Sequence, residues 1–104
     1  MSERGFNHRT SLEERMFGYL TQMGIEFTEQ YPTRSGFLLD FAILDKKIAI
    51  ETDGNPWHTS RQQKTRDRFR DYMLKREGWI VIRFGEIFTL DDVKKKLTAA
   101  MPPA

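Results

Sequence analysis

One aspartate interrupts the most hydrophobic stretch of the sequence. Asp40 lies inside the apolar run of residues 37–43, which is typical of a buried strand. Because side chains alternate along a strand, we expect Leu39 and Phe41 to share the face opposite to Asp40. A buried carboxylate without a partner is destabilising, so Asp40 needs a metal ion, a cation or solvent at a sheet edge. A charge on a solvated sheet face is the alternative explanation.

A second acidic group follows the next apolar run. Residues 48–52 predict a strand, joined to the first by a tight reversal at residues 45–47. Glu51 and Asp53 are two positions apart and therefore share one face, and an antiparallel hairpin would bring them level with Asp40. Two or three carboxylates at a sheet edge form a hard oxygen site suited to Mg²⁺ or Mn²⁺. The alternative is an ordinary polar strand terminus, and the sequence leaves open whether Glu51 or Asp53 faces the metal.

Trp57 and His58 come next, on a loop that begins at Gly54. A histidine beside a carboxylate cluster can take or give a proton near neutral pH. A tryptophan there offers a surface on which nucleic-acid bases stack. An ordinary surface histidine and a partly buried core tryptophan are the alternatives.

Two further acids complete the set of candidate chemical groups. Glu14 lies in residues 11–14, which fit a helix capping box, and this pattern alone would account for a glutamate there. Asp67 lies in a basic stretch, where an ion pair with Lys64 or Arg70 on the same helix is the alternative to a functional role.

The positive charge of the chain is concentrated in residues 54–83. This segment holds eight arginines and lysines against three acids, a formal charge of +5, which leaves −3 for the rest of a chain whose total is +2. A basic block beside an acidic remainder suits a phosphate-binding surface next to a carboxylate cluster, although a solvated helix face is the alternative. The candidate DNA-binding residues are Trp57, Arg61, Lys64, Arg66, Arg68 and Arg83.

The elements that position these residues follow from periodicity and capping. Helices are predicted at residues 11–24, 61–77 and 89–100, and strands at residues 25–30, 37–43, 48–52 and 79–84. The order α-β-β-β-α-β-α predicts an α/β domain, with a mixed four-stranded sheet flanked by helices. In the long polar helix we expect Phe69, Tyr72 and Met73 to make the apolar contacts with the core. Residues 1–10 are expected to form a flexible arm, 11–100 a single domain, and 101–104 a frayed tail.

Composition restricts the class of protein. The chain has 104 residues, of which 38% are hydrophobic and 31% charged, which is typical of a single folded domain. No cysteine is present, so disulfides and cysteine-ligated zinc are excluded. No apolar run approaches the ~20 residues that span a bilayer, and the N-terminus lacks a signal peptide pattern. We therefore expect no membrane partner and a cytoplasmic location, associated with the nucleoid or with a phage-infected cell.

Taken together, these residues resemble the very-short-patch-repair-like (Vsr-like) branch of the PD-(D/E)XK nuclease superfamily. The likeness is carried by residues 12–15, 37–43, 48–54, 57–58, 67 and 78–84, and extends over nearly the whole chain from residue 11 to 97. Within this branch the chain is most similar to the homing-endonuclease family named for its Glu-Asp-x-His-Asp (EDxHD) pattern. Those letters fall on Glu14, Asp40, His58 and Asp67, with Glu51 or Asp53 as the variable member.

The resemblance implies a restriction-endonuclease-like αβββαβ core and a Mg²⁺-dependent endonuclease that hydrolyses phosphodiester bonds of double-stranded DNA. Asp40 and Glu51, with the Thr52 carbonyl, would then hold the metal against the scissile phosphate. His58 would activate water, because Asp53 stands where the superfamily has its lysine. Asp67 would orient the imidazole of His58.

The remaining implied roles concern water, phosphate and partners. Glu14 would position a metal-bound water, and Arg66, Arg68 and Arg83 would contact phosphates. The mismatch-repair enzymes hold a structural zinc that a chain without cysteine does not build in the same way. No recognition module is evident in these 104 residues, so a homodimer or a partner protein would supply sequence specificity. A catalytically inactive nucleic-acid-binding module, a mismatch-repair nickase and a purely structural partner domain remain the alternatives.

Overall fold

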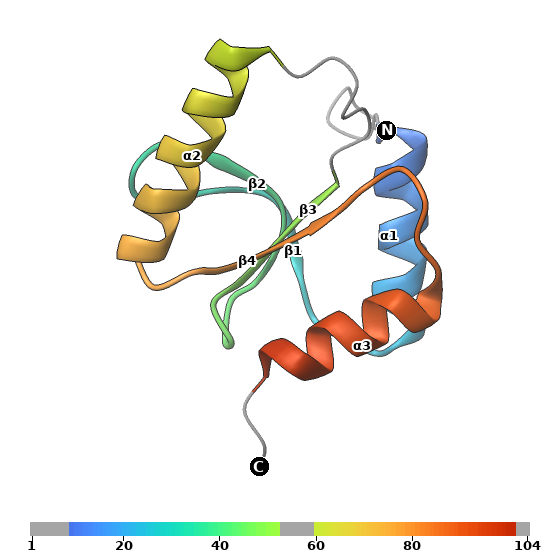
Figure 1. The fold of residues 1–104 in the computed structure, drawn as a ribbon. Helices are drawn as coiled ribbons and strands as arrows, with labels where there is room; N and C mark the ends of the chain where they lie inside the picture. Colours follow the sequence, from blue (N-terminus) through green and yellow to red (C-terminus); the bar gives the residue numbers. More distant parts are fainter. Residues whose placement is uncertain (1–8, 53–59, 102–104) are drawn as a thin grey trace, which may run out of the picture.

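The computed structural model describes residues 9–52 and 60–101 as seven elements in the predicted order (Figure 1). The helices are α1 (Ser11–Gln22), α2 (Arg61–Arg76) and α3 (Leu90–Ala100). The strands are β1 (Thr28–Pro32), β2 (Leu38–Ile43), β3 (Ile48–Thr52) and β4 (Ile80–Phe84).

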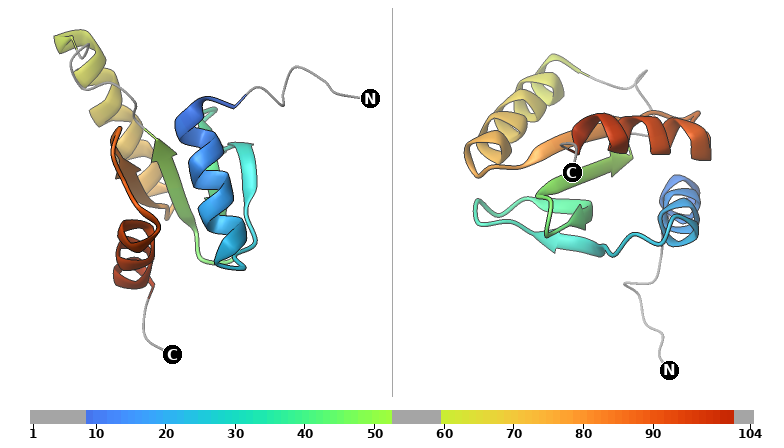
Figure 2. Two further views of the ribbon diagram at one scale, coloured as in Figure 1. Left: turned by 90° about the vertical axis from the view of Figure 1, so that its right-hand side faces the viewer. Right: turned by 90° about the horizontal axis from the view of Figure 1, so that it is seen from below.

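The four strands form one mixed sheet in the order β1-β2-β3-β4 (Figure 2). The pairs β1–β2 and β2–β3 are antiparallel. The pair β3–β4 is parallel, because the connection that contains α2 carries the chain back along the sheet before β4 begins. In the parallel pair Glu51 lies beside Arg83, and Thr52 beside Phe84. The prediction of an α/β domain with a mixed four-stranded sheet flanked by helices is confirmed.

Helices cover both faces of the sheet, α2 on one face and α1 with α3 on the other (Figure 1). The core on the α1 and α3 side includes Met16, Leu20 and Val93 packed on the inward side chains of β2, β3 and β4. A smaller core lies under α2 and contains Leu74 and Trp79. The sheet is therefore buried on both faces, which explains the nearly continuous apolar run of β3.

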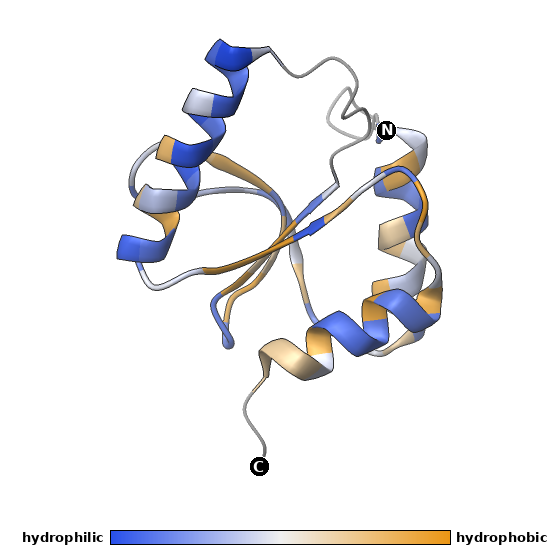
Figure 3. Cartoon of the chain, viewed as in Figure 1, coloured by the Kyte–Doolittle hydropathy of each residue, from blue (hydrophilic) through white to orange (hydrophobic). Residues whose placement is uncertain are grey.

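The prediction for the apolar contacts of α2 is wrong in part. Phe69 contacts the Phe37 ring and Met73 is half-buried, but neither they nor Tyr72 anchor the helix. Phe69 and Tyr72 are 58% and 55% exposed, whereas Leu74, which the prediction omitted, is fully buried against the sheet. The helix is mostly polar in Figure 3, and its inward stripe is set by one leucine and by charged residues that face the ends of the strands. Spacing within so polar a helix gave no unique apolar stripe, so the packing partner decided its rotation.

The first strand begins three residues later than predicted, at Thr28. Ile25 and Phe27 have the expected apolar character, but they pack on the α1 and α3 core as part of the connection. The ladder begins at Thr28, opposite Ala42, and runs through Pro32. An edge strand tolerates a terminal proline, because its outward amide needs no partner in the sheet.

Candidate active site

Asp40 and Glu51 come together where the ladder between β2 and β3 ends. The regular register extends only as far as Phe41 opposite Ile50. Beyond that pair, side chains replace the ladder bonds. The Asp40 amide donates to Glu51 Oε2 at 2.9 Å, and the Thr52 amide and hydroxyl donate to Asp40 Oδ2 at 2.9 and 3.2 Å. The predicted convergence of these two acids is therefore present in the structure.

The same interruption overturns one detail of the strand prediction. Leu39 does not share a face with Phe41, because it packs with Ala42 in the core under α2, whereas Phe41 packs in the opposite core. The neighbouring strand is irregular at the same level, since Gln30 of β1 has a left-handed φ of 48°. With the carboxylates occupying ladder positions, the strict alternation of side chains is lost at Asp40.

Arg70 of α2 is a site residue that the sequence analysis missed. Its guanidinium forms an ion pair with Glu51 Oε1 and donates to the Leu38 carbonyl at 2.8 Å. From the sequence, Arg70 is expected only as a possible ion-pair partner of Asp67, and the structure shows no such pair. The detectable signal was helical spacing, since Arg70 lies four residues before the buried Leu74 and so faces the sheet.

The two carboxyl groups share an environment that disfavours negative charge. Burial raises the pKa of Asp40, although the hydrogen bonds from Thr52 oppose the change. Burial, followed by the charge of Asp40, raises the pKa of Glu51 to about 7 in spite of the Arg70 ion pair. Glu51 is only 5% exposed, so water screens this repulsion poorly. Bringing a cation to this pair would remove the repulsion, as expected at a metal-binding or phosphate-processing site.

The first helix contributes its acids differently from the prediction. The capping box is formed by Thr10 and Glu13, whose amides and side chains bond reciprocally at 2.9 and 3.1 Å, so Ser11 and Glu14 have no part in it. The spacing of the motif requires three residues from cap to acid, which Thr10 and Glu13 satisfy. Glu14 is exposed and contacts Arg9 at 3.5 Å. It is the negative charge of Glu13 that acts on Asp40 and contributes to raising the pKa of Asp40.

The inner stripe of α2 carries two further acids. Asp71 accepts a hydrogen bond from Arg83 of β4 at 2.5 Å, which links the helix to the strand beside Glu51. Asp67 lies one turn earlier, is half-buried, and makes no hydrogen bond or ion pair within residues 9–52 and 60–101. Its placement on the sheet-facing side is compatible with the role predicted for it.

The other predicted site residues divide into two groups. Asp53, Trp57 and His58 lie outside the described residues, so their predicted roles remain predictions. The candidate phosphate contacts Arg61, Lys64, Arg66 and Arg68 are exposed on α2.

The carboxylate oxygens of Asp40 and Glu51 are the candidate ligands for a divalent metal ion. Among the described residues no three acidic or histidine side chains form a metal-binding group. Two hard oxygen donors are nevertheless adjacent, and within the described part of the chain Asp40 Oδ1 accepts no hydrogen bond. Asp40 and Glu51 therefore fit a Mg²⁺ or Mn²⁺ ion as part of its ligand set.

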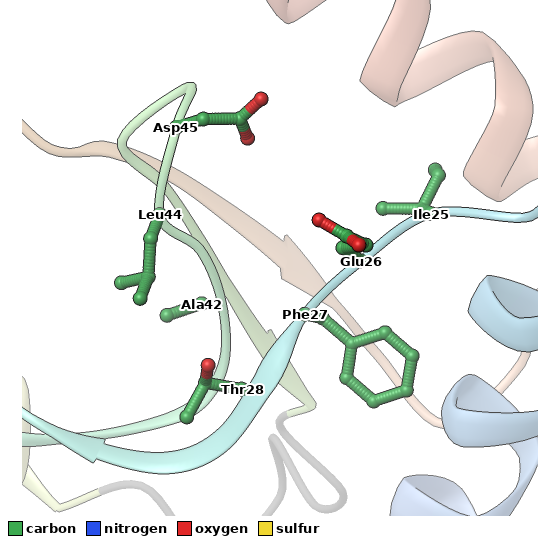
Figure 4. A pocket seen from close by; sticks show the side chains of 7 residues that line it. All are labelled: Ile25, Glu26, Phe27, Thr28, Ala42, Leu44 and Asp45. Carbon is green, nitrogen blue, oxygen red and sulfur yellow. The ribbon is translucent and has the colours of Figure 1, made fainter.

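A depression in the described structure lies away from the carboxylate pair. It has a volume of about 610 Å³ and is lined by residues of the α1–β1 connection and of the turn after β2 (Figure 4). Neither Asp40 nor Glu51 lines it, and Glu26 and Asp45 make its mouth acidic. Its lining includes no cation, whereas Arg70 lies beside the carboxylate pair, so the pair is the better candidate site for a phosphate substrate.

The fold and the paired carboxylates at its strand ends define a restriction-endonuclease-like domain. The chain belongs to the family described as REase_MTES_1575, whose model matches residues 12–99. Among solved structures, the catalytic domain of the homing endonuclease I-Bth0305I is similar with a TM-score of 0.63 and 21% sequence identity, over 88% of each chain. At that identity the likeness shows the fold. No curated protein matches the chain. No described helix is long and apolar enough to cross a membrane.

Proposed function

We propose that this protein is a divalent-metal-dependent endonuclease that cuts double-stranded DNA. The observation that carries the proposal is the pairing of Asp40 and Glu51 at the ends of β2 and β3, in a chain of a restriction-endonuclease-like family. A buried acid and a half-buried acid that repel one another weaken a fold, so a role in binding explains their juxtaposition better than stability does. A Vsr-like or homing-type enzyme of the EDxHD pattern is the specific form we propose.

Asp40 and Glu51, with the Thr52 carbonyl, are the residues that would hold Mg²⁺ or Mn²⁺. When bound, the ion would polarise the scissile phosphate and stabilise the leaving oxyanion. The chain itself orients these ligands. Thr52 fixes one oxygen of Asp40, and the other accepts no hydrogen bond from the described residues, while Arg70 and the Asp40 amide each hold one oxygen of Glu51.

Proton transfer and substrate binding fall to residues around this pair. We assign activation of the attacking water to His58, oriented by Asp67 from the inner side of α2, with Asp53 as a further acid of the site. From α1, Glu14 is the acid predicted to position water, but it is exposed, whereas Glu13 is half-buried and its charge acts on Asp40, and we therefore propose Glu13 for this role.

DNA phosphates would be held by cationic side chains next to the site. The candidates are Arg61, Lys64, Arg66, Arg68 and Arg83, with Trp57 stacking on bases. Arg83 already donates a hydrogen bond to Asp71, so it would hold β4 and α2 together at the site as well as contact phosphate. Such contacts set affinity and leave sequence preference to a second copy or a partner protein.

The test is nicking of supercoiled plasmid in the presence of Mg²⁺ or Mn²⁺. Asp40→Asn keeps the shape of the side chain but removes the ligand charge, so we expect cleavage to be lost while folding is retained. Asp45→Asn, in the exposed turn after β2, is the matched control and should cleave as wild type does. If the wild-type protein binds DNA and does not cut it with either metal, the inactive nucleic-acid-binding module becomes the better assignment. If Asp40→Asn cuts normally, the site is misplaced.

A further inference from the structure

The solvent-facing side of α2 has an unusual distribution of charge. Its exposed positions include six cations and no acid, because both acids of the helix lie on the inner stripe. The exposed cations are Arg61, Lys64, Arg66, Arg68, Lys75 and Arg76. A helix face that serves only solubility usually mixes both signs, as α3 does with its Asp91–Lys95 pair. The like charges on α2 repel one another, so a negatively charged partner would stabilise this face.

Aromatic rings accompany these cations toward the end of α2. Phe69 and Tyr72 are more than half exposed, although one edge of Phe69 contacts the Phe37 ring at 6.4 Å between centroids. Tyr72 accepts a hydrogen bond from Arg76 at 3.3 Å, and the guanidinium lies over its ring at 5.8 Å from the centroid. Alternating cations and exposed rings are the surface chemistry that binds nucleic-acid backbone and bases together.

A pocket of about 450 Å³ continues this surface beyond the C-terminal end of α2. Arg76 belongs to both the helix face and the pocket, and two further cations reach the pocket from the turns that flank β2, Arg34 and Lys47. Trp79 forms an aromatic wall, with the Lys47 ammonium 4.7 Å from its ring centroid. Tyr31 packs at 5.8 Å from the Trp79 ring, so aromatic surface continues across the pocket.

Opposing charges in this pocket are fewer than the cations. Glu77 lines it, and the C-terminal end of α2 contributes a partial charge of about −0.5. Lys47 already bonds the Glu77 carbonyl at 2.7 Å, which neutralises part of that end. Arg34 makes no side-chain hydrogen bond or ion pair among the residues that the structure describes, so its charge is available to a ligand.

We propose that Phe69, Tyr72 and Arg76, together with the pocket cations Arg34 and Lys47, form a second contact for DNA backbone, beside the carboxylate pair and toward the C-terminal end of α2. This inference rests on the proposed function, which supplies DNA as the partner. Arg70, which pairs with Glu51, and Arg76 lie on the same helix, separated by about 9 Å along its axis or roughly three base-pair steps. The second contact therefore extends from the edge of the site toward the C-terminal end of α2. A second copy of this chain is disfavoured as the partner, because two such cationic faces repel.

The experiment measures binding of a fluorescent 30-base-pair duplex of arbitrary sequence, in EDTA, over a range of salt concentrations. The double variant Arg34→Ala/Arg76→Ala removes two exposed cations of the second contact. Lys46→Ala/Lys94→Ala removes the same charge from exposed positions outside it and is the matched control. We expect the first variant to weaken binding roughly tenfold and to reduce the slope of log K against log salt by about 1.8, with the control close to wild type. Phe69→Ala/Tyr72→Ala should weaken binding with no change in that slope.

The possible outcomes separate the two proposals. Equal binding by Arg34→Ala/Arg76→Ala and by its control overturns the second contact while leaving the proposed function in place. Absence of DNA binding by the wild-type chain overturns both. Two other anions are tested in parallel, inorganic phosphate and vesicles of phosphatidylglycerol. If either protects Arg34 and Arg76 from chemical modification and the duplex does not, the surface serves a free anion or a lipid and the proposal is wrong.

Discussion

Replacing Glu51 with glutamine should make the metal-free protein gain stability relative to wild type as the pH rises, while abolishing its function. In the folded protein the pKa of Glu51 is raised from 4.5 to about 7, by burial first and then by the charge of Asp40. The folded state therefore binds a proton that the unfolded state has already lost between these two pH values. Stability is unaffected by this group below pH 4.5, falls as the pH rises to 7, and stays lowered above it.

The magnitude follows from the size of that shift. Each unit of pKa corresponds to about 1.4 kcal/mol, so the loss across the window is roughly 3 kcal/mol. Little of it is screened by solvent, because Glu51 is almost fully buried. Glutamine has no charge to titrate, and this part of the pH dependence should disappear. The amide also leaves either Arg70 or the Asp40 amide without its acceptor, a loss of about 1–3 kcal/mol that is the same at every pH.

The assay is urea unfolding of wild type and Glu51→Gln in EDTA, at intervals from pH 4.5 to 8.5. The difference in unfolding free energy should move by roughly 3 kcal/mol in favour of the variant across that range. Glu86→Gln, at an exposed position after β4, controls for loss of one negative charge. Adding Mg²⁺ at pH 8 should stabilise wild type and leave Glu51→Gln unchanged. If the unfolding free energies of the two proteins change in parallel with pH, the reasoning is refuted, because folding would then not raise the pKa of Glu51.

Three further predictions address the general base, the core and the first helix. His58→Ala should slow single-turnover cleavage by roughly 10²–10⁴-fold and remove the acidic break in the pH–rate profile; retention of both rate and break would make His58 a surface residue. Leu74→Ala should lower the unfolding free energy by about 2–5 kcal/mol, whereas Phe69→Ala should change it by less than about 1 kcal/mol, and equal losses in urea unfolding would contradict the assigned rotation of α2. Glu13→Gln should reduce cleavage more than Glu14→Gln, with circular dichroism checking that α1 remains folded; the reverse order would restore the role predicted for Glu14.

Local patterns in the sequence predict most of the fold. Apolar runs, turn residues and capping motifs give the order of the seven elements, and both ends of β3 and the C-terminal end of β4 agree with the structure to the residue. These features are predictable because they depend on neighbours within a few positions along the chain. The start of β1 was displaced, since Ile25 and Phe27 are apolar for packing on a core and not for pairing in a ladder.

The candidate site was only partly predictable. Asp40 and Glu51 stand out in the sequence as acids in apolar strands, and a short hairpin is enough to bring them level. Arg70 and Glu13 do not stand out, because an arginine in a basic helix and a glutamate in a capping box each have a sufficient local explanation. Their relation to the site depends on how α1 and α2 pack on the sheet.

The sequence by itself therefore determined the elements, their order and the acids at the strand ends. Tertiary structure alone decided the rotation of α2, which turns Leu74 and Arg70 inward and leaves Phe69 and Tyr72 in solvent. It also decided the hydrogen bonding at Asp40, where side chains take over the ladder and Leu39 changes face. The physical reason is range: helix and strand formation are governed by short-range spacing and sterics, whereas the partner of a buried charge is chosen by the packing of segments far apart in the chain.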